Sequence, residues 1–156
     1  MNLNFKLVLV ERGEKASLYS VILEGEKESE FDKFLIDPQI SGYEKFDELL
    51  AQLDEIINRY GCQERFFRNE SSIFDSVAAL PRGDLRLYCC RYGNIILIVG
   101  SGGIKKTRTY QEDPALDQAV QIMAEVSRRV DEKIRNREIQ YSGNSFKGDL
   151  NFRIEE

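Results

Sequence analysis

The chain has 156 residues, of which 42% are hydrophobic and 31% charged, and its net charge is −5. These values favour a soluble globular protein, with residues 1–156 as one domain. No apolar run approaches the about 18 residues of a membrane span, so we expect no membrane partner. Histidine is absent, which excludes histidine-activated nucleophiles and histidine-ligated metals. Three cysteines without a disulfide or zinc pattern, and no signal-peptide pattern at the N-terminus, favour a cytoplasmic location.

Residues 1–81 are predicted to form N-terminal strands and helices. Apolar, β-branched runs at 5–10 and 17–23 flank a turn-like segment, which predicts a hairpin. Apolar residues then recur at helical spacing between about 42 and 60, which predicts a core-packing helix. For this helix, Ser41-x-x-Glu44 predicts a capping box at the N-terminus, and Gly61 suits the C-cap.

A second hairpin is predicted in the region 82–137. Strand-like runs at 85–92 and 95–99 flank Gly93-Asn94, which is typical of a two-residue hairpin turn. Alternation in the first run produces an apolar face, which we expect to lie against the helices. The opposite face of the same run carries one cation and two aromatic residues: Arg86, Tyr88 and Tyr92.

In the C-terminal third of the chain, the sequence predicts a long helix followed by a short extension. Asp113-Pro114 is typical of a helix start, with aspartate at the N-cap and proline at the first helical position. Apolar residues continue at helical spacing to about residue 136. The extension at 138–156 alternates on both sides of Ser142–Asn144, which predicts a last hairpin.

Positive charge is concentrated between residues 82 and 110, although the whole chain is acidic. This segment holds one acidic residue, Asp84, and six basic residues: Arg82, Arg86, Arg91, Lys105, Lys106 and Arg108. Such a cluster predicts a positive surface on an acidic protein, the alternative being scattered, solvated charge on a sheet edge. The run Gly100-Ser-Gly-Gly before two lysines is not a nucleotide-binding P-loop, because it lacks the terminal Gly-Lys-Ser/Thr and no helix begins at Thr107.

These motifs together resemble the RelE/HigB-like toxin superfamily of type II toxin–antitoxin systems, and its phage-derived Gp49-like branch most of all. The resemblance rests on Leu85-Arg-Leu-Tyr88, on the hairpin, and on Val99-Gly-Ser-Gly-Gly-Ile-Lys-Lys-Thr-Arg-Thr-Tyr110 before a proline-started helix. It covers residues 80–135. It implies an α+β fold, with a curved antiparallel sheet, helices packed on one face, an RNA groove on the other, and here an extra C-terminal hairpin.

The resemblance also implies a metal-independent endoribonuclease, an mRNA interferase that needs no cofactor. Members cleave mRNA on the ribosome by attack of the ribose 2′-OH on the adjacent phosphate. The candidate catalytic residues are Arg86, Lys105, Lys106, Arg108 and Tyr110, and the candidate RNA-binding residues are Arg82, Tyr88 and Tyr92. Guanidinium groups suit bidentate phosphate contact, lysine acts as a point charge, and tyrosine rings can stack on bases.

The partners implied by the resemblance are an antitoxin with a helix-turn-helix domain, the ribosome and mRNA. Two alternatives stay open, because family members are usually basic and this chain is acidic. One is a catalytically inactive RelE-like module that binds a partner protein. The other is a phage-derived accessory protein of unrelated fold, in which residues 82–110 form an exposed hairpin.

Overall fold

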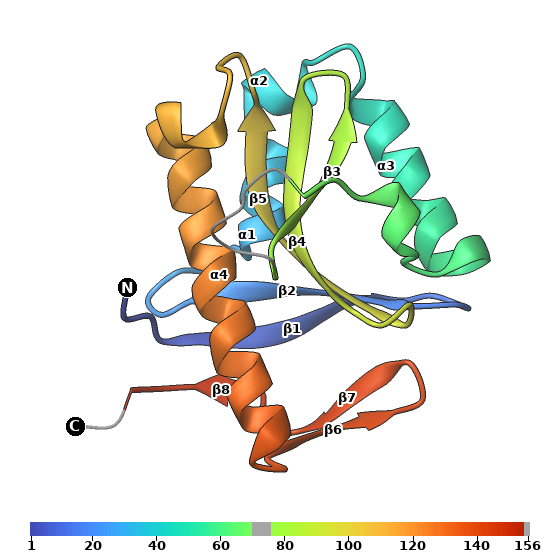
Figure 1. Ribbon diagram of the computed structural model, residues 1–156, viewed down its shortest axis with the longest axis vertical. Coiled ribbons are helices and arrows are strands. Elements are labelled where there is room, and N and C mark those ends of the chain that lie inside the picture. The colour runs from blue at the N-terminus through green and yellow to red at the C-terminus, as the bar shows by residue number, and fades with distance from the viewer. Residues whose placement is uncertain (70–75, 155–156) are drawn as a thin grey trace.

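A six-stranded sheet forms the centre of the computed structural model, which describes residues 1–69 and 76–154 (Figure 1). In spatial order its strands are β3 (Ala78–Arg82), β4 (Leu85–Tyr92), β5 (Ile96–Ile104), β2 (Ser17–Leu23), β1 (Phe5–Arg12) and β8 (Asn151–Phe152). All neighbouring strands are antiparallel except β2 and β5, which are parallel. The fold is therefore α+β with a mostly antiparallel sheet. An antiparallel sheet was expected, and the parallel pair β2–β5 departs from it. These two strands are not joined by a hairpin, because the chain passes from β2 through the helices and through β3 and β4 before it forms β5.

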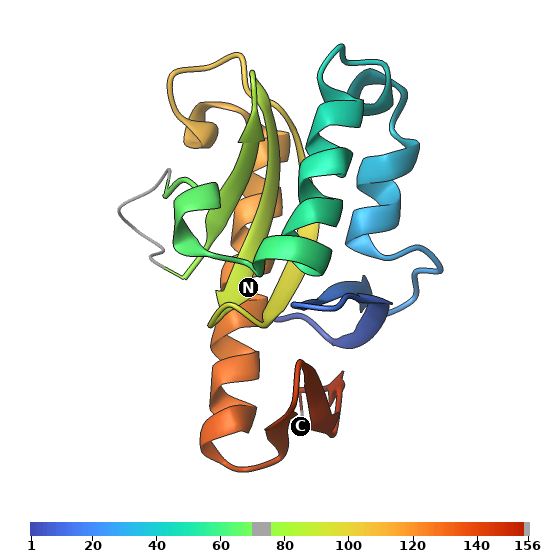
Figure 2. The ribbon, with the colours of Figure 1, turned by 90° about the vertical axis from the view of Figure 1, so that its right-hand side faces the viewer.

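Helices cover both faces of the sheet (Figures 1 and 2). The long helix α4 (Pro114–Arg135) crosses one face, and the other face carries α1 (Glu30–Ile36), α2 (Pro38–Ser41) and α3 (Phe46–Glu55). The expectation that helices pack on one face is therefore wrong. The central strands require cover on both sides, because Leu97 packs in the core under α3 whereas Ile96 packs in the core under α4.

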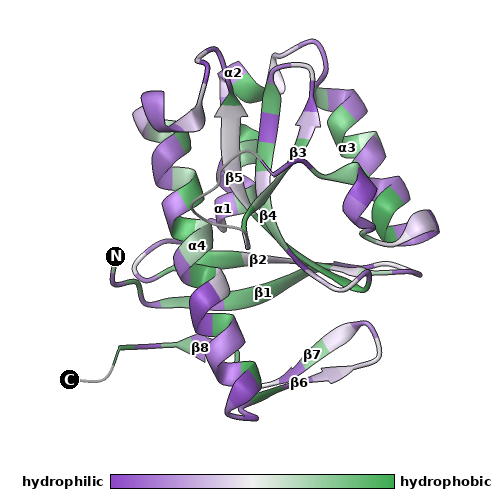
Figure 3. Ribbon diagram, viewed as in Figure 1, coloured by the Kyte–Doolittle hydropathy of each residue, from purple (hydrophilic) through white to green (hydrophobic). Residues whose placement is uncertain are grey.

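The strand β4 divides its side chains between these two cores, as its alternation predicts. Leu85, Leu87 and Cys89 lie in the α3-side core, whereas Tyr88 and Tyr92 lie in the α4-side core. The face with the two tyrosines is therefore covered by α4 and is not an open groove. Figure 3 shows hydrophobic colour along β4 and the first part of β5, while the segment that joins β5 to α4 is largely hydrophilic.

The predicted hairpin of β4 and β5 is confirmed and lies inside the sheet, not on an exposed edge. Its turn holds three residues instead of two, because Tyr92 pairs with Ile96. The N-terminal hairpin of β1 and β2 is confirmed as well. A third hairpin, β6 (Ile139–Ser142) and β7 (Ser145–Gly148), confirms the hairpin predicted around Ser142–Asn144, whereas β8 pairs with β1 in the central sheet.

Local capping signals fix the start of α4 but not the start of α3. Asp113 accepts hydrogen bonds from the backbone N–H groups of Ala115 and Leu116, at 3.0 and 3.3 Å. By contrast, Ser41 is the last residue of α2, and α3 begins after Lys45 without a side-chain cap. The predicted capping box is therefore wrong. The helix continues as the π-helical turn η1 (Ile56–Tyr60) and ends, as predicted, at Gly61, whose φ is 78°.

The three cysteines are free and buried. Burial raises the pKa of Cys62 to about 11 and, together with the charge of Asp131, the pKa of Cys90 to about 12. We expect the native thiols to react with a thiol reagent at pH 8 at least roughly a hundredfold more slowly than the unfolded chain, because less thiolate is present and access is blocked. Labelling rates with and without urea measure the difference. Rapid labelling of the native protein would contradict this packing.

Candidate functional site

The pairing of β4 with β5 gathers the predicted cations at one end of the sheet. Arg86 pairs with Gly103 and Leu85 with Ile104, so Lys105 follows directly beside the start of β4. The N–H of Lys105 donates to the carbonyl of Asp84 at 2.7 Å. We call this region, with Arg86, Lys105, Lys106 and Arg108, the basic end. It lies at the upper end of β4 and β5 in Figure 1.

Within the basic end, Arg86 is buried and holds the turn between β3 and β4. Its side chain is 6% exposed, and Nη1 donates to the carbonyl oxygens of Gly83 and Leu85 at 2.7 and 3.0 Å. Strand alternation places Arg86 on the α4 side of the sheet. Lys105 follows the last residue of β5, and its backbone N–H meets Asp84 just before β4. The backbone of Lys105 is therefore close to the start of β4, where Arg86 lies, as predicted.

The candidate tyrosines do not form an open surface. Tyr88 and Tyr110 are 2% and 1% exposed, and their ring centroids lie 6.2 Å apart in an edge-on arrangement inside the α4-side core. Tyr92 lies at the far end of β4, where it packs edge-on against Phe146 at 5.4 Å. Burial raises the pKa of Tyr92 above its ordinary range. A role in base stacking would require these rings to leave the core.

The remaining candidates separate by exposure and by side of the sheet. Lys106 and Arg108 are exposed and extend the basic end toward solvent. Arg82 shares the strand face of Leu80, which packs in the α3-side core, so it lies on the face opposite to Arg86. Lys45, which was not among the predicted site residues, also lies at this end of the sheet. Its stem is so close to the β3–β4 turn that a Cβ on Gly83 would come within 2.8 Å of its Cδ.

The glycine run between the hairpin and the lysines has a packing role. The run lies within β5, where Leu87 pairs with Gly102 but Cys89 pairs with Val99, so the strand bulges opposite Tyr88. A Cβ on Gly102 would lie 1.8 Å from the carbonyl oxygen of Arg86, and one on Gly103 3.0 Å from Leu116. The glycine run therefore allows β4 on one side and α4 on the other to approach β5 closely.

A cavity of about 410 Å³ lies between α3 and the end of β3, and of its two arginines only Arg82 was predicted as a site residue. We call it the α3–β3 pocket. It is lined by Glu48, Ala51, Gln52, Glu55, Tyr60, Arg65, Phe66 and Arg82. A signal was present in the sequence, because arginine and aromatic residues are interleaved from Arg59 to Arg68.

In the α3–β3 pocket, Arg65 belongs to the 3-10 turn η2 (Glu64–Phe66) and stacks on its neighbours. Its guanidinium carbon lies 4.1 Å from the ring centroid of Phe66 and 5.7 Å from that of Tyr60. The π-helical end of α3 brings Tyr60 to this position, and the rings of Tyr60 and Phe66 lie 5.7 Å apart. The pocket thus joins residues from α3, η1, η2 and β3.

The described residues 1–69 and 76–154 contain no group of three or more metal-binding side chains placed to hold a metal ion, and no helix among them is long and apolar enough to cross a bilayer. Comparisons of the chain with protein-family models, curated proteins and solved structures found no significant match. The RelE/HigB assignment therefore stays a prediction from the sequence motifs.

Proposed function

We propose that the chain is the toxin component of a type II toxin–antitoxin pair and that it cleaves mRNA on the ribosome. The observation that supports this proposal best is the register of β4 and β5, which groups Arg86 and Lys105 next to the exposed Lys106 and Arg108. In-line attack of a ribose hydroxyl on phosphorus depends mainly on positioning and on stabilisation of negative charge. Cations gathered at this end of the sheet would meet that requirement without histidine.

The burial of Arg86 suggests a division of roles within the basic end. Lys106 and Arg108 are exposed and would contact the RNA phosphates, since neutralised phosphates supply most of the affinity for nucleic acid. Arg86 would act as a positioning residue, because its hydrogen bonds to Gly83 and Leu85 fix the turn beside Lys105. Tyr110 stays a candidate for proton transfer, with its ring packed against Tyr88 in this conformation.

The test compares wild type with Lys106→Ala/Arg108→Ala, because both side chains are exposed and their loss should spare the core. The matched control is Lys6→Ala/Lys147→Ala, which removes two exposed cations elsewhere. On induction in bacteria without an antitoxin, wild type and control should arrest growth and cleave translated mRNA. The Lys106/Arg108 variant should cleave about tenfold more slowly, and the salt slope of its RNA binding should fall by about 1.4 for two lost phosphate contacts. A folded wild type that neither arrests growth nor cleaves mRNA would refute the proposal.

A second candidate function is a protein-binding module without catalysis. It is favoured by one observation, namely that Arg86 and Tyr110 are only 6% and 1% exposed, so two candidate catalytic residues are covered. The same induction experiment distinguishes the two functions. Copurification with the protein of the adjacent gene, combined with intact mRNA, would favour the binding module.

A further inference from the structure

The α3–β3 pocket lies on the opposite side of the sheet from Arg86 and has the composition of a binding site. Its volume is about 410 Å³, and cations, aromatic rings and carboxylates all line it. Arg82 connects the pocket to the basic end, because it is the last residue of β3, just before the Gly83-Asp84 turn that accepts the N–H of Lys105. Arg82 is therefore the residue of the pocket that lies nearest to the basic end along the chain.

The exposed side chain of Arg65 is oriented at the rim of the pocket by contacts with its neighbours. Its Nε donates to the side-chain oxygen of Gln63 at 2.8 Å, and its guanidinium carbon lies over the Phe66 ring at 4.1 Å from the centroid. It makes no ion pair with any residue in the part of the chain that the structure describes. The terminal amino groups are thus oriented in advance for an anion, which reduces the entropy lost on binding.

Two further polar atoms of pocket residues lack partners. The Nε of Arg82 and the Oε1 of Gln52 are screened from solvent, and neither has a hydrogen-bond partner among residues 1–69 and 76–154. Buried polar atoms are usually paired, because an unpaired one loses its hydration without compensation. One is a donor and the other an acceptor. Because both atoms are screened from solvent, a ligand that offers an acceptor and a donor would pair with them only once the Arg82 and Gln52 side chains turn toward the pocket.

The other lining residues narrow the class of ligand. Tyr60 is 37% exposed, and Arg59 lies 5.3 Å from its ring centroid, so the ring offers a stacking surface beside the cations. Glu48 and Glu55 would repel a bare polyanion but can accept hydrogen bonds from amino or hydroxyl groups. A nucleotide unites an anionic phosphate, a flat base and such donors, and base–aromatic stacking tolerates any base.

We propose that the α3–β3 pocket binds one nucleotide unit, with its phosphate between Arg65 and Arg82 and its base against Tyr60. The proposal rests on the proposed function in one respect, namely that the nucleotide belongs to an RNA strand that continues to the basic end. A free mononucleotide offers the same chemistry, and the experiment distinguishes the two sources.

The experiment titrates the full-length protein with uridine and adenosine monophosphates and with an eight-nucleotide single-stranded RNA. Binding is followed by calorimetry and by the NMR signal of the Arg82 Nε–H group. We expect this signal to shift, and Arg65→Ala and Tyr60→Ala each to weaken binding at least tenfold, because a charge-assisted contact or a stacking surface is lost. Arg12→Ala, which removes an exposed arginine from β1, is the matched control and should bind as wild type does. Melting temperatures establish that each variant is folded.

The source of the nucleotide follows from the RNA arm. Tighter binding of the octamer, weakened further by Lys106→Ala/Arg108→Ala, supports the strand, whereas equal affinity for octamer and monophosphate supports the free nucleotide. An unshifted Arg82 signal with every nucleotide overturns the proposal, as does binding of a Glu- and Tyr-containing acidic peptide in place of nucleotides. Cleavage by wild type that is unaltered in Arg65→Ala and Tyr60→Ala, without nucleotide binding, refutes the pocket but leaves the proposed function. Nucleotide binding by a protein that is not toxic supports the pocket but refutes the proposed function.

Discussion

Replacing Gly102 with alanine is expected to lower the free energy of unfolding by about 3 kcal/mol or more, from the range of overpacking costs. The new Cβ would lie 1.8 Å from the carbonyl oxygen of Arg86 and 3.2 Å from the Cα of Leu87. Both atoms belong to the backbone of β4, so relief requires the two central strands to separate. A loss of this size is a large share of the about 5–15 kcal/mol that stabilises a typical domain.

The adjacent glycine offers a matched control for this prediction. At Gly103 the new Cβ would meet only Cδ2 of Leu116, at 3.0 Å, and the end of a leucine side chain can shift. We expect Gly103→Ala to cost less than about 1 kcal/mol, as for small core changes that repack. Urea unfolding followed by circular dichroism measures both variants. Equal losses at the two positions would show that β4 and β5 do not approach as described.

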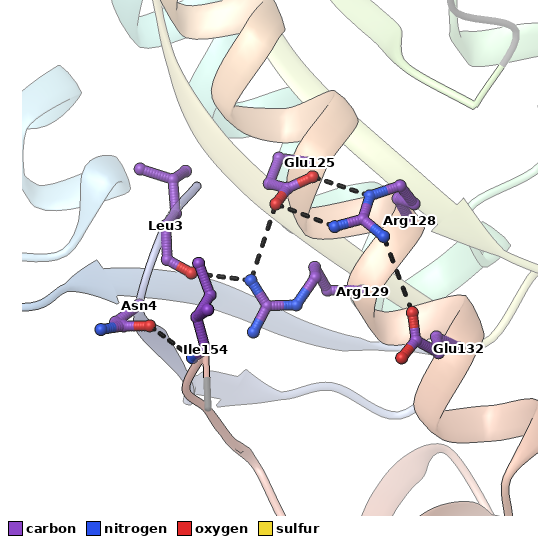
Figure 4. A network of polar contacts seen from close by, with 7 residues as sticks. All are labelled: Leu3, Asn4, Glu125, Arg128, Arg129, Glu132 and Ile154. Atoms are coloured by element: carbon purple, nitrogen blue, oxygen red, sulfur yellow. Dashed lines mark hydrogen bonds and ion pairs between the residues drawn. The ribbon is translucent and has the colours of Figure 1, made fainter. Parts of the chain in front are cut away.

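Replacing Glu125 with glutamine is expected to cost about 2 kcal/mol, because Glu125 is the centre of a partly buried charge network (Figure 4). Its carboxylate accepts from Arg128 at 2.8 Å and lies 3.6 Å from Arg129, which in turn donates to the carbonyl of Leu3 at 2.7 Å. The Glu125 side chain is 8% exposed and that of Arg129 is 12% exposed. Loss of the Glu125 charge therefore leaves Arg129 as a poorly hydrated cation without its partner. The cost is below that of a fully buried pair, since Arg128 is 60% exposed.

Two comparisons test the charge network. Glu132→Gln should cost under about 0.5 kcal/mol, because Glu132 is 52% exposed and 3.6 Å from Arg128. Arg129→Met combined with Glu125→Gln should cost less than the sum of the single changes, since the two side chains interact. Additive losses, or a Glu132 variant as unstable as Glu125→Gln, would contradict the network.

The network also predicts a dependence on pH. Burial alone would raise the pKa of Glu125, but Arg128 and Arg129 outweigh it and hold the pKa below its ordinary value of 4.5. Because the folded pKa is the lower one, the stabilisation is present above pH 4.5 and is lost as the pH falls through the folded pKa. The difference in unfolding free energy between wild type and Glu125→Gln should therefore shrink at low pH. An unchanged difference at pH 3 would contradict a charged Glu125.

The sequence by itself determined the elements that local interactions specify. Alternation correctly assigned the two faces of β4, and the hairpin pattern correctly paired β4 with β5. Asp113 and Pro114 correctly marked the start of α4, because a helix cap and a preset φ act within one turn. The proximity of Arg86 and Lys105 was predictable for the same reason, since it follows from the register of one hairpin.

Only the tertiary structure decided which helix covers which face and which side chains reach solvent. Both faces of β4 carry residues that can be buried, so alternation could not show that α4 covers Tyr88 and Tyr92. The Ser41-x-x-Glu44 pattern was compatible with a cap, but the turn of α2 occupies Ser41 first. Likewise, Arg65 and Arg82 are separated in sequence, and they line one pocket because α3 packs over the end of β3. Such contacts depend on docking between distant segments, which no local pattern encodes.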